Sequence, residues 1–165
     1  MKKFFIAGLI LSAVFLNASV PLQAASYEET VAQWTSYKDV AKWLDKYFTF
    51  DKTRPMSFVP RSPEETFKLR SGRCYDGAAF AKDALNRINP AYNAKFIFME
   101  FSGLPNHWQT AFTLDGKLFI MDYSAGGQLS PIMGTHGPFD SLRQYQDFLS
   151  SKGFKANILE YRKND

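Results

Sequence analysis

The stretch that decides the fold is Gly72-Arg73-Cys74-Tyr75-Asp76-Gly77-Ala78-Ala79-Phe80-Ala81, which contains the single cysteine of the 165-residue chain. The preceding helical pattern is interrupted at Gly72, and apolar residues then recur at helical spacing until Asn89-Pro90 stops them. This pattern predicts a helix that begins at Cys74. Unsatisfied backbone N–H groups and the dipole at a helix N-terminus favour the thiolate form of a cysteine. Cys74 is therefore the leading candidate for a chemical role.

Three further helices are predicted upstream of this cysteine. We expect a short helix near residues 29–36 and a second over residues 39–48, where the apolar residues fall on one helical stripe. Ser62-Pro63-Glu64-Glu65 combines an N-cap serine, a proline at the first helical position and a glutamate three residues after the serine. A third helix is expected from there to about Leu69. Residues 51–61 contain two prolines and are predicted to form a loop.

The sequence beyond Pro90 changes from a helical to a strand pattern. An antiparallel meander of three strands is predicted at residues 95–101, 107–114 and 117–123. A long loop is expected over residues 124–138. Asp140 is then expected to cap a helix that ends near Ser151, and residues 154–161 are expected to form a last strand.

The turn Asp115-Gly116 predicts how the last two strands of the meander pair. This dipeptide is typical of a two-residue hairpin loop, and it sets a register in which Gln109 faces Asp122. His107 shares a face with Gln109, so His107 and Asp122 lie diagonally across the pair, within reach of a hydrogen bond. A shift of one residue in the register would place the two side chains on opposite faces.

Cys74, His107 and Asp122 together have the chemistry of a nucleophilic triad. The thiolate would attack an acyl carbon, His107 would act as general base and then protonate the leaving amine, and Asp122 would hold the imidazole tautomer. The backbone N–H of Cys74 is the first candidate for an oxyanion donor. His136 is a competing base, although the register places no acid beside it.

Each of these residues also has a purely structural interpretation. Cys74 would then be a buried inert thiol, His107 a satisfied polar side chain, and Asp122 the end of a strand. The corresponding function is a non-catalytic binding domain with a packed cysteine. A thiol-redox function is disfavoured because the chain has no resolving cysteine.

The first 25 residues have the pattern of a secretory signal peptide. Lys2 and Lys3 precede an apolar run over residues 4–15, and Ala24-Ala25 offers small residues for cleavage. The run is shorter than the roughly 20 residues of a membrane anchor. We therefore expect an exported protein without a membrane anchor after cleavage, in which residues 26–165 form a single domain.

Composition limits the partners of the mature chain. The net charge of +4 includes Lys2 and Lys3, and falls to +2 without them. Lysine and arginine form no run, so nucleic acid is not expected as a partner. A single cysteine excludes an internal disulfide.

Three blocks of the chain resemble the transglutaminase-like superfamily. Residues 72–78 are similar to its Gly-x-Cys-x-Asp-x-Ala signature. Asn106-His107-Trp108, Asp115-Gly116 and Met121-Asp122 resemble its histidine and aspartate blocks, in the expected order. The resemblance implies an α+β fold with a papain/transglutaminase-like core, in which N-terminal helices and the cysteine helix pack on an antiparallel sheet.

The resemblance also implies roles for individual residues. The triad is Cys74, His107 and Asp122, and Asp76 is a motif residue that caps the cysteine helix and compensates its dipole. Members of the superfamily use an upstream Trp, Gln or Tyr side chain at the oxyanion, for which Gln33 and Trp34 are the candidates here.

The superfamily contains peptidases, amide hydrolases and transglutaminases. The sequence shows no Asp/Asn-rich loop with calcium-binding spacing, so we expect a small bacterial enzyme that needs no metal or other cofactor. Its expected partner is a protein or peptide substrate of the cell envelope, in the periplasm or outside the cell. The substrate, the choice between water and an amine as acyl acceptor, and the oligomeric state stay open.

Overall fold

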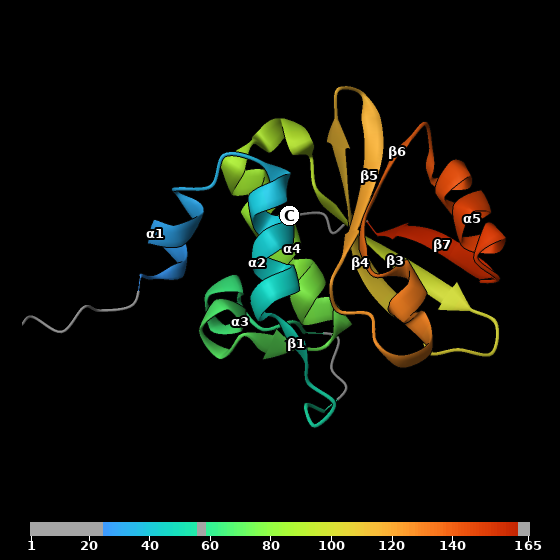
Figure 1. Cartoon of the computed structure of the whole chain (residues 1–165), viewed down its shortest axis with the longest axis horizontal. Coiled ribbons are helices and arrows are strands. Elements are labelled where there is room, and N and C mark those ends of the chain that lie inside the picture. Colours follow the sequence, from blue (N-terminus) through green and yellow to red (C-terminus); the bar gives the residue numbers. More distant parts are fainter. Residues whose placement is uncertain (1–24, 56–58, 162–165) are drawn as a thin grey trace, which may run out of the picture.

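The computed structural model describes residues 25–55 and 59–161, so the predicted signal peptide lies outside the described residues. Helices fill the N-terminal half of the described chain and a sheet fills the C-terminal half (Figure 1). The four N-terminal helices are α1 (Tyr27–Val31), α2 (Tyr37–Tyr47), α3 (Pro63–Leu69) and α4 (Cys74–Ile88). The last α-helix, α5 (Leu142–Ser151), lies on the far side of the sheet from α4.

Local capping chemistry sets where these helices start. The Ser62 hydroxyl accepts a hydrogen bond from the backbone N–H of Glu65 at 3.1 Å, and α3 has the predicted bounds. The first helix is shorter than expected and the second starts earlier than expected. The reason is Asp39, whose carboxylate accepts the backbone N–H groups of Thr35 and Ser36 at 2.9 and 3.0 Å and so starts α2 at that point.

The main sheet has five antiparallel strands in the order β6-β5-β4-β3-β7. They are β3 (Lys95–Phe101), β4 (His107–Leu114), β5 (Lys117–Asp122), β6 (Gly134–Phe139) and β7 (Ala156–Tyr161). The predicted hairpin register is confirmed, because Leu114 pairs with Lys117 and Thr110 pairs with Met121. Asp115 and Gly116 have φ angles of +52° and +73°, as a tight hairpin turn of this kind requires.

The prediction of a loop over residues 124–138 is wrong for most of this segment. The segment contains a 3₁₀ helix, η2 (Gly127–Ile132), and strand β6, which pairs with β5 at the edge of the sheet. Gly134, Gly137 and Pro138 lower the strand propensity of this segment, but an edge strand needs backbone hydrogen bonds on one side only and tolerates such residues.

Two smaller differences concern the ends of elements. Ser141, one residue after the predicted cap, accepts the backbone N–H of Gln144 and starts α5. Asp140, directly after β6, instead forms an ion pair with Lys117 at the start of the neighbouring strand β5. A short parallel pair, β1 (Thr49–Phe50) and β2 (Ser71–Gly72), was not predicted, and it holds the chain just before Cys74.

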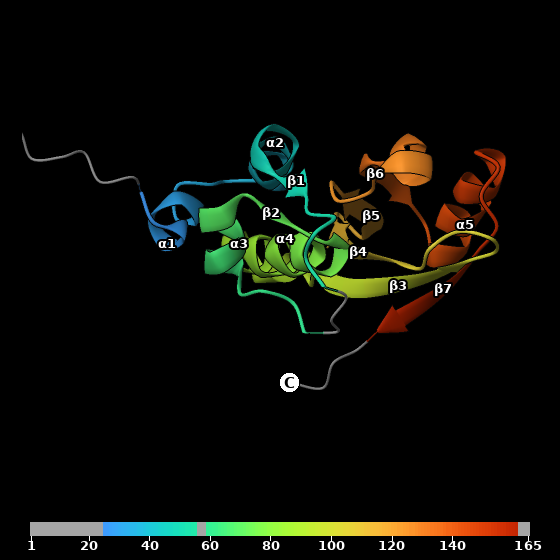
Figure 2. The ribbon, with the colours of Figure 1, turned by 90° about the horizontal axis from the view of Figure 1, so that it is seen from below.

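The sheet is covered on both faces, as the view in Figure 2 shows from below. On one face, Phe112 and Met121 pack in a cluster with Phe80 of α4 and Trp43 of α2. Thr110 donates a buried hydrogen bond to the backbone carbonyl of Ala78 at 2.8 Å, which fixes α4 on β4. The other face is packed against η2 and α5 through buried side chains that include Ile97, Ile120, Ile132, Tyr145 and Leu149.

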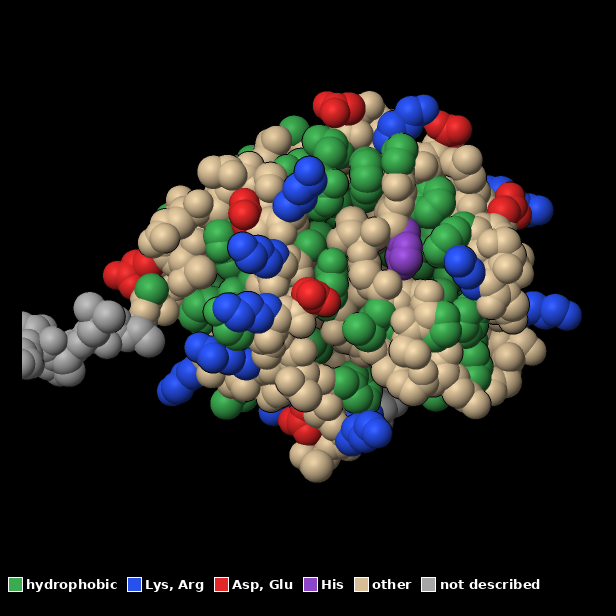
Figure 3. Space-filling view, viewed as in Figure 1, with side chains coloured by type: hydrophobic (Ala, Val, Ile, Leu, Met, Phe, Trp, Pro, Cys, Tyr) green, Lys and Arg blue, Asp and Glu red, His purple; other side chains and the backbone are tan. Residues whose placement is uncertain are grey.

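The exposed side of α2 carries Lys38, Lys42 and Lys46 at intervals of four residues, so the three share one helical face. Figure 3 shows lysine and arginine side chains gathered over this part of the molecule. Within residues 25–55 and 59–161, no helix has both the length and the apolar composition needed to cross a bilayer.

Candidate active site

The start of α4 places Cys74 at the rim of a cavity. Strand β2 ends at Gly72, whose carbonyl accepts the backbone N–H of Asp51 at 2.8 Å, and Arg73 is the N-cap residue in an extended conformation. The chain before the helix is therefore held in place by pairing to β1. Cys74 is the first residue of α4, and it is partly exposed.

Asp76 ties the first turn of α4 to the loop that follows β1. Its side chain is fully buried, and Oδ2 accepts the backbone N–H of Arg73 at 2.8 Å. Oδ1 accepts the backbone N–H of Arg61 at 2.7 Å and Nη2 of Arg54 at 3.2 Å. Nε of Arg54 lies 2.8 Å from Oδ2 as an ion pair, although it lacks the alignment of a hydrogen bond. Asp76 thus caps the helix, as the resemblance implied, and anchors two arginines of the loop.

His107 and Asp122 form the predicted contact across β4 and β5. His107 Nε2 lies 2.7 Å from Asp122 Oδ2, and both side chains are buried. Because Asp122 occupies Nε2, Nδ1 is the ring nitrogen left to serve Cys74, which lines the same cavity as His107 and contributes to raising the pKa of its imidazole. The structure therefore brings Cys74, His107 and Asp122 together in the order of the prediction.

The Asp122 carboxylate receives hydrogen bonds on both oxygens. Oδ2 also accepts Nε2 of Gln109 at 3.0 Å. Oδ1 accepts the backbone N–H groups of Ser124 and Ala125 at 3.0 and 3.1 Å, and the Ser124 hydroxyl at 3.1 Å. Five donors thus surround a carboxylate that is cut off from water, which fixes both its charge and its orientation.

Burial is the largest single influence on the pKa of His107 and of Asp122. In each case the opposing charges and hydrogen bonds together outweigh it. It lowers the pKa of His107, whereas the charge and hydrogen bond of Asp122, and then the contact with Cys74, raise the pKa to about 10. Burial raises the pKa of Asp122, whereas His107, Gln109 and Ser124 bring it below its ordinary value. Both shifts favour the charged forms of the pair, an imidazolium beside a carboxylate.

The cavity at Cys74 has a volume of about 540 Å³ and aromatic walls. Phe50 comes from β1, and Phe98 and Trp108 come from β3 and β4, with their ring centroids 4.8 Å apart. His107, Asn106 and Ser124 also line it. A cavity of this size has room for several residues of an extended peptide.

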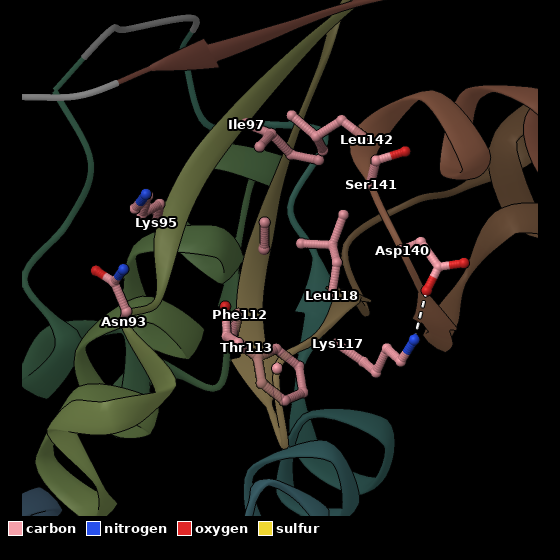
Figure 4. A pocket seen from close by; sticks show the side chains of 12 residues that line it. Asn93, Lys95, Ile97, Phe112, Thr113, Lys117, Leu118, Asp140, Ser141 and Leu142 are labelled. Atoms are coloured by element: carbon pink, nitrogen blue, oxygen red, sulfur yellow. Dashed lines mark hydrogen bonds and ion pairs between the residues drawn. The ribbon is translucent and has the colours of Figure 1, made fainter.

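A second cavity lies at the opposite end of the sheet, beside the hairpin that joins β4 and β5. Its volume is about 280 Å³, and its lining residues include Asn93, Lys95, Thr113 and Leu142. Figure 4 shows Lys117 reaching toward Asp140 on its margin. No triad residue lines this cavity.

Comparison with known proteins identifies the family. A family model described as a transglutaminase-like domain matches residues 21–133, which is more than half of the chain. The chain belongs to the transglutaminase-like family. The predicted family and the α+β fold class are thus confirmed.

Among solved structures, the transglutaminase-like domain is similar to LapG of Legionella pneumophila in an EGTA-treated form. The sequence identity is 18% and the TM-score is 0.40, with 54% of this chain and 51% of LapG covered. The chain thus spans about half the length of LapG. Among proteins with curated descriptions, none matches.

The structure does not bring the two candidate oxyanion side chains to the cavity of this transglutaminase-like domain. Gln33 is exposed, and Trp34 packs edge-on against Phe80 in the core at a centroid distance of 6.3 Å. Neither lines the cavity at Cys74. The upstream segment that does reach it follows β1, because β1 pairs with β2 directly before the cysteine helix.

His136 lies outside the site. Its ring lies between β6 and α5, where Nε2 is 3.0 Å from the backbone carbonyl oxygen of Ile132 and the ring packs 5.0 Å from that of Phe148. It does not line the cavity at Cys74.

Sequence reasoning missed the partners that hold Asp122 in the transglutaminase-like domain. Gln109 was placed opposite Asp122 by the register, but its role as an amide donor was not recognised. Ser124 could have been found from its spacing, because a side chain of Asp often accepts the backbone N–H two residues later. Tyr145 gave no local signal, since it reaches Gln109 from α5. Within the described ranges, no cluster of three or more His, Cys, Asp or Glu is placed to hold a metal ion.

Proposed function

We propose that the protein is a thiol-dependent acyl hydrolase or acyl transferase that cleaves peptide or amide bonds, with Cys74, His107 and Asp122 as its catalytic triad. The observation that carries the proposal is the buried imidazole of His107, which bonds to Asp122 through Nε2 and lines the same cavity as Cys74. The raised pKa of His107 supports it, because an imidazolium is the partner that a thiolate nucleophile needs.

The geometry supports a mechanism with a covalent thioester. The Cys74 thiolate attacks the acyl carbon, and the carbonyl oxygen becomes an oxyanion beside the backbone N–H of Cys74, which as the first residue of α4 has no acceptor within the helix. When the C–N bond breaks, His107 Nδ1 gives its proton to the leaving amine. Asp122 keeps its hydrogen bond to Nε2 throughout, which preserves the tautomer that step requires.

The thioester is then released by a second nucleophile. Neutral His107 takes a proton at Nδ1 from water or from an amine, and the new C–O or C–N bond forms as the C–S bond breaks and the thiolate returns. Water gives hydrolysis, and an amine gives acyl transfer. The aromatic walls of the cavity suit an extended peptide, so we propose a protein or peptide substrate.

We further propose that the substrate belongs to the cell envelope, and that the enzyme works in the periplasm or outside the cell of a bacterium. The charged and apolar pattern of residues 1–25 supports this placement. Trapping thioester partners of Cys74 in envelope extracts would identify the substrate.

Alkylation of Cys74 tests the proposed triad. We expect iodoacetamide at pH 6 to label folded protein faster than the same chain unfolded in urea, because the N-terminus of α4 and the charged imidazole of His107 stabilise the negative charge on the attacking sulfur. His107→Gln should abolish this difference in labelling rate between the folded and the unfolded chain, while circular dichroism shows that the variant is folded. If Cys74 is labelled only after unfolding, the site is a packed thiol and the protein is a non-catalytic binding domain.

A further inference from the structure

Among the described residues that line the cavity at Cys74, two carry positive charge and none is an acid. Apart from His107, the charged side chains among its 14 lining residues are Lys52 and Arg73. The others are aromatic, apolar or small polar residues and glycine. An incoming substrate therefore meets a surface of one sign.

Four carboxylates, Asp51, Asp76, Glu100 and Asp122, lie within two residues of this wall in the sequence, and each has a partner elsewhere. The exposed Glu100 accepts Nδ2 of Asn157 at 3.3 Å. Asp51 accepts the hydroxyl of Thr53 at 2.7 Å, and its other oxygen lies 3.6 Å from Arg61 Nη2. Asp76 and Asp122 are buried in the networks described above. None of these four carboxylates is among the residues that line the cavity.

Arg73 and Lys52, the two cations of the wall, differ in their contacts. The Arg73 guanidinium donates to the backbone carbonyl of Arg54, and to that of Lys52 at 3.0 Å, and it packs over the ring of Phe50. Arg73 thus holds the loop that carries Lys52. Lys52 is exposed, and among the described residues no carboxylate pairs with its ammonium group.

We propose that this cavity selects substrates with a carboxylate close to the cleaved bond, and that Lys52 is the specificity-determining residue that recognises it. The proposal rests on the proposed function, since it names the substrate class of the same site. An acidic side chain would direct its carboxylate to Lys52 while its apolar stem and neighbouring residues lie along Phe98 and Trp108. The expected substrate is an acidic peptide or amide.

Two alkylating reagents test this charge preference without knowledge of the natural substrate. Iodoacetate and iodoacetamide both form a carbon–sulfur bond with the thiolate as iodide leaves, and they differ in bearing a carboxylate or a neutral amide. The measured quantity is the ratio of their rate constants with Cys74. We expect this ratio to be about threefold or more higher in the folded protein than in the same chain unfolded in urea, and to fall as salt is added.

Substitutions at Lys52 and at a remote lysine give the matched comparison. Lys52→Met should lower the ratio toward that of the unfolded chain, and Lys52→Glu should lower it further, while Arg73 remains in the wall. Lys38→Glu makes the same change of charge in the first turn of α2, where a glutamate suits the helix dipole. Lys38 does not line the cavity, and this variant should keep the wild-type ratio.

The outcomes separate the two proposals. If iodoacetamide labels Cys74 rapidly but the ratio matches that of the unfolded chain in wild type and in Lys52→Glu, the triad stands and the acidic substrate is wrong. If neither reagent labels folded Cys74 faster than the unfolded chain, the proposed function is overturned, and the substrate class that rests on it falls as well.

Discussion

The side-chain amide of Gln109 donates to the Asp122 carboxylate at 3.0 Å, and the carboxylate sets the orientation of this amide because it can only accept. With the NH₂ group facing Asp122, Gln109 Oε1 faces Tyr145 and accepts its hydroxyl at 2.9 Å. Gln109 and Tyr145 are both fully buried. A directed chain of hydrogen bonds therefore runs from α5 through β4 to the carboxylate that orients His107.

Removing the amide should break this chain at its centre. Gln109→Met keeps the approximate volume but deprives Asp122 of a donor and the Tyr145 hydroxyl of its acceptor, so we expect the free energy of unfolding to fall by about 1–3 kcal/mol. Urea denaturation measures the change. Tyr145→Phe, which leaves only Gln109 Oε1 unsatisfied, should cost less than Gln109→Met. An equal or larger cost for Tyr145→Phe would contradict the central position of Gln109.

Asp122→Asn should be more damaging than its similar shape suggests. An amide has one acceptor oxygen, whereas both oxygens of Asp122 face donors: His107 and Gln109 on one side, and the backbone N–H groups of Ser124 and Ala125 on the other. Either orientation of the new NH₂ group therefore meets other donors. We expect a loss of about 3 kcal/mol or more in the free energy of unfolding, together with loss of the rapid alkylation of Cys74.

Ser124→Ala is the control for this substitution. It removes one hydroxyl donor to Asp122 and keeps both backbone N–H groups, so its cost should stay near 1 kcal/mol. The Ser124 hydroxyl is also 3.4 Å from the backbone carbonyl of Cys74, but it has a single proton and the contact with Asp122 is shorter. Equal effects of Ser124→Ala and Asp122→Asn would show that the charge of Asp122 is not what matters.

Much of this site could be predicted because it rests on local chemistry. The start of α3 follows from Ser62, Pro63 and Glu65, and the pairing of His107 with Asp122 follows from one hairpin turn. In both cases the residues that give the signal lie within a few positions of the helix start or strand pairing that they determine.

The unpredicted parts depend on contacts between distant segments. Strand β6 forms because β5 offers an edge, despite the glycines and proline in its sequence. Tyr145 meets Gln109 across 36 positions of the chain, and only the packing of α5 on the sheet brings them together. Trp34 was a candidate for the oxyanion because of its residue type, whereas its position was decided by the apolar core around Phe80.

The raised pKa of His107 should make stability depend on pH in a defined window. An unfolded histidine titrates near pH 6.5, and the folded pKa is about 10. A group with a raised folded pKa contributes its full stabilisation below the unfolded value and loses it as the pH rises through the folded value. We expect the free energy of unfolding of the wild type to fall relative to that of His107→Gln between about pH 6.5 and pH 10.

Urea denaturation of both proteins across this range measures the difference, and groups common to both largely cancel. Parallel curves for the two proteins would show that His107 has no raised pKa. The lowered pKa of Asp122 acts in the opposite direction, since its stabilisation is present above the unfolded value, near pH 3.9, and is lost as the pH falls. Maximum stability from the pair is therefore expected between about pH 4 and pH 6.5.

Gly72→Ala tests whether the packing before the cysteine helix positions Cys74. A Cβ atom at Gly72 would lie 2.5 Å from Cβ and 2.8 Å from Oδ2 of Asp76, which is itself held by Arg54, Arg61 and Arg73. Because Asp76 has no room to move, the start of α4 has to shift. We expect a loss of about 1–3 kcal/mol in the free energy of unfolding and slower alkylation of Cys74 by iodoacetamide.

Gly126→Ala provides the matched glycine substitution. Gly126 has an extended backbone, with φ −147° and ψ 168°, and a Cβ there meets no atom within 4 Å. Its effect on the free energy of unfolding should therefore stay within about 0.5 kcal/mol. Gly72→Ala could instead change the free energy of unfolding as little as Gly126→Ala and leave the alkylation rate unchanged. In that case the contact between Gly72 and Asp76 does not position Cys74, and the pairing of β1 with β2 alone holds the start of the helix.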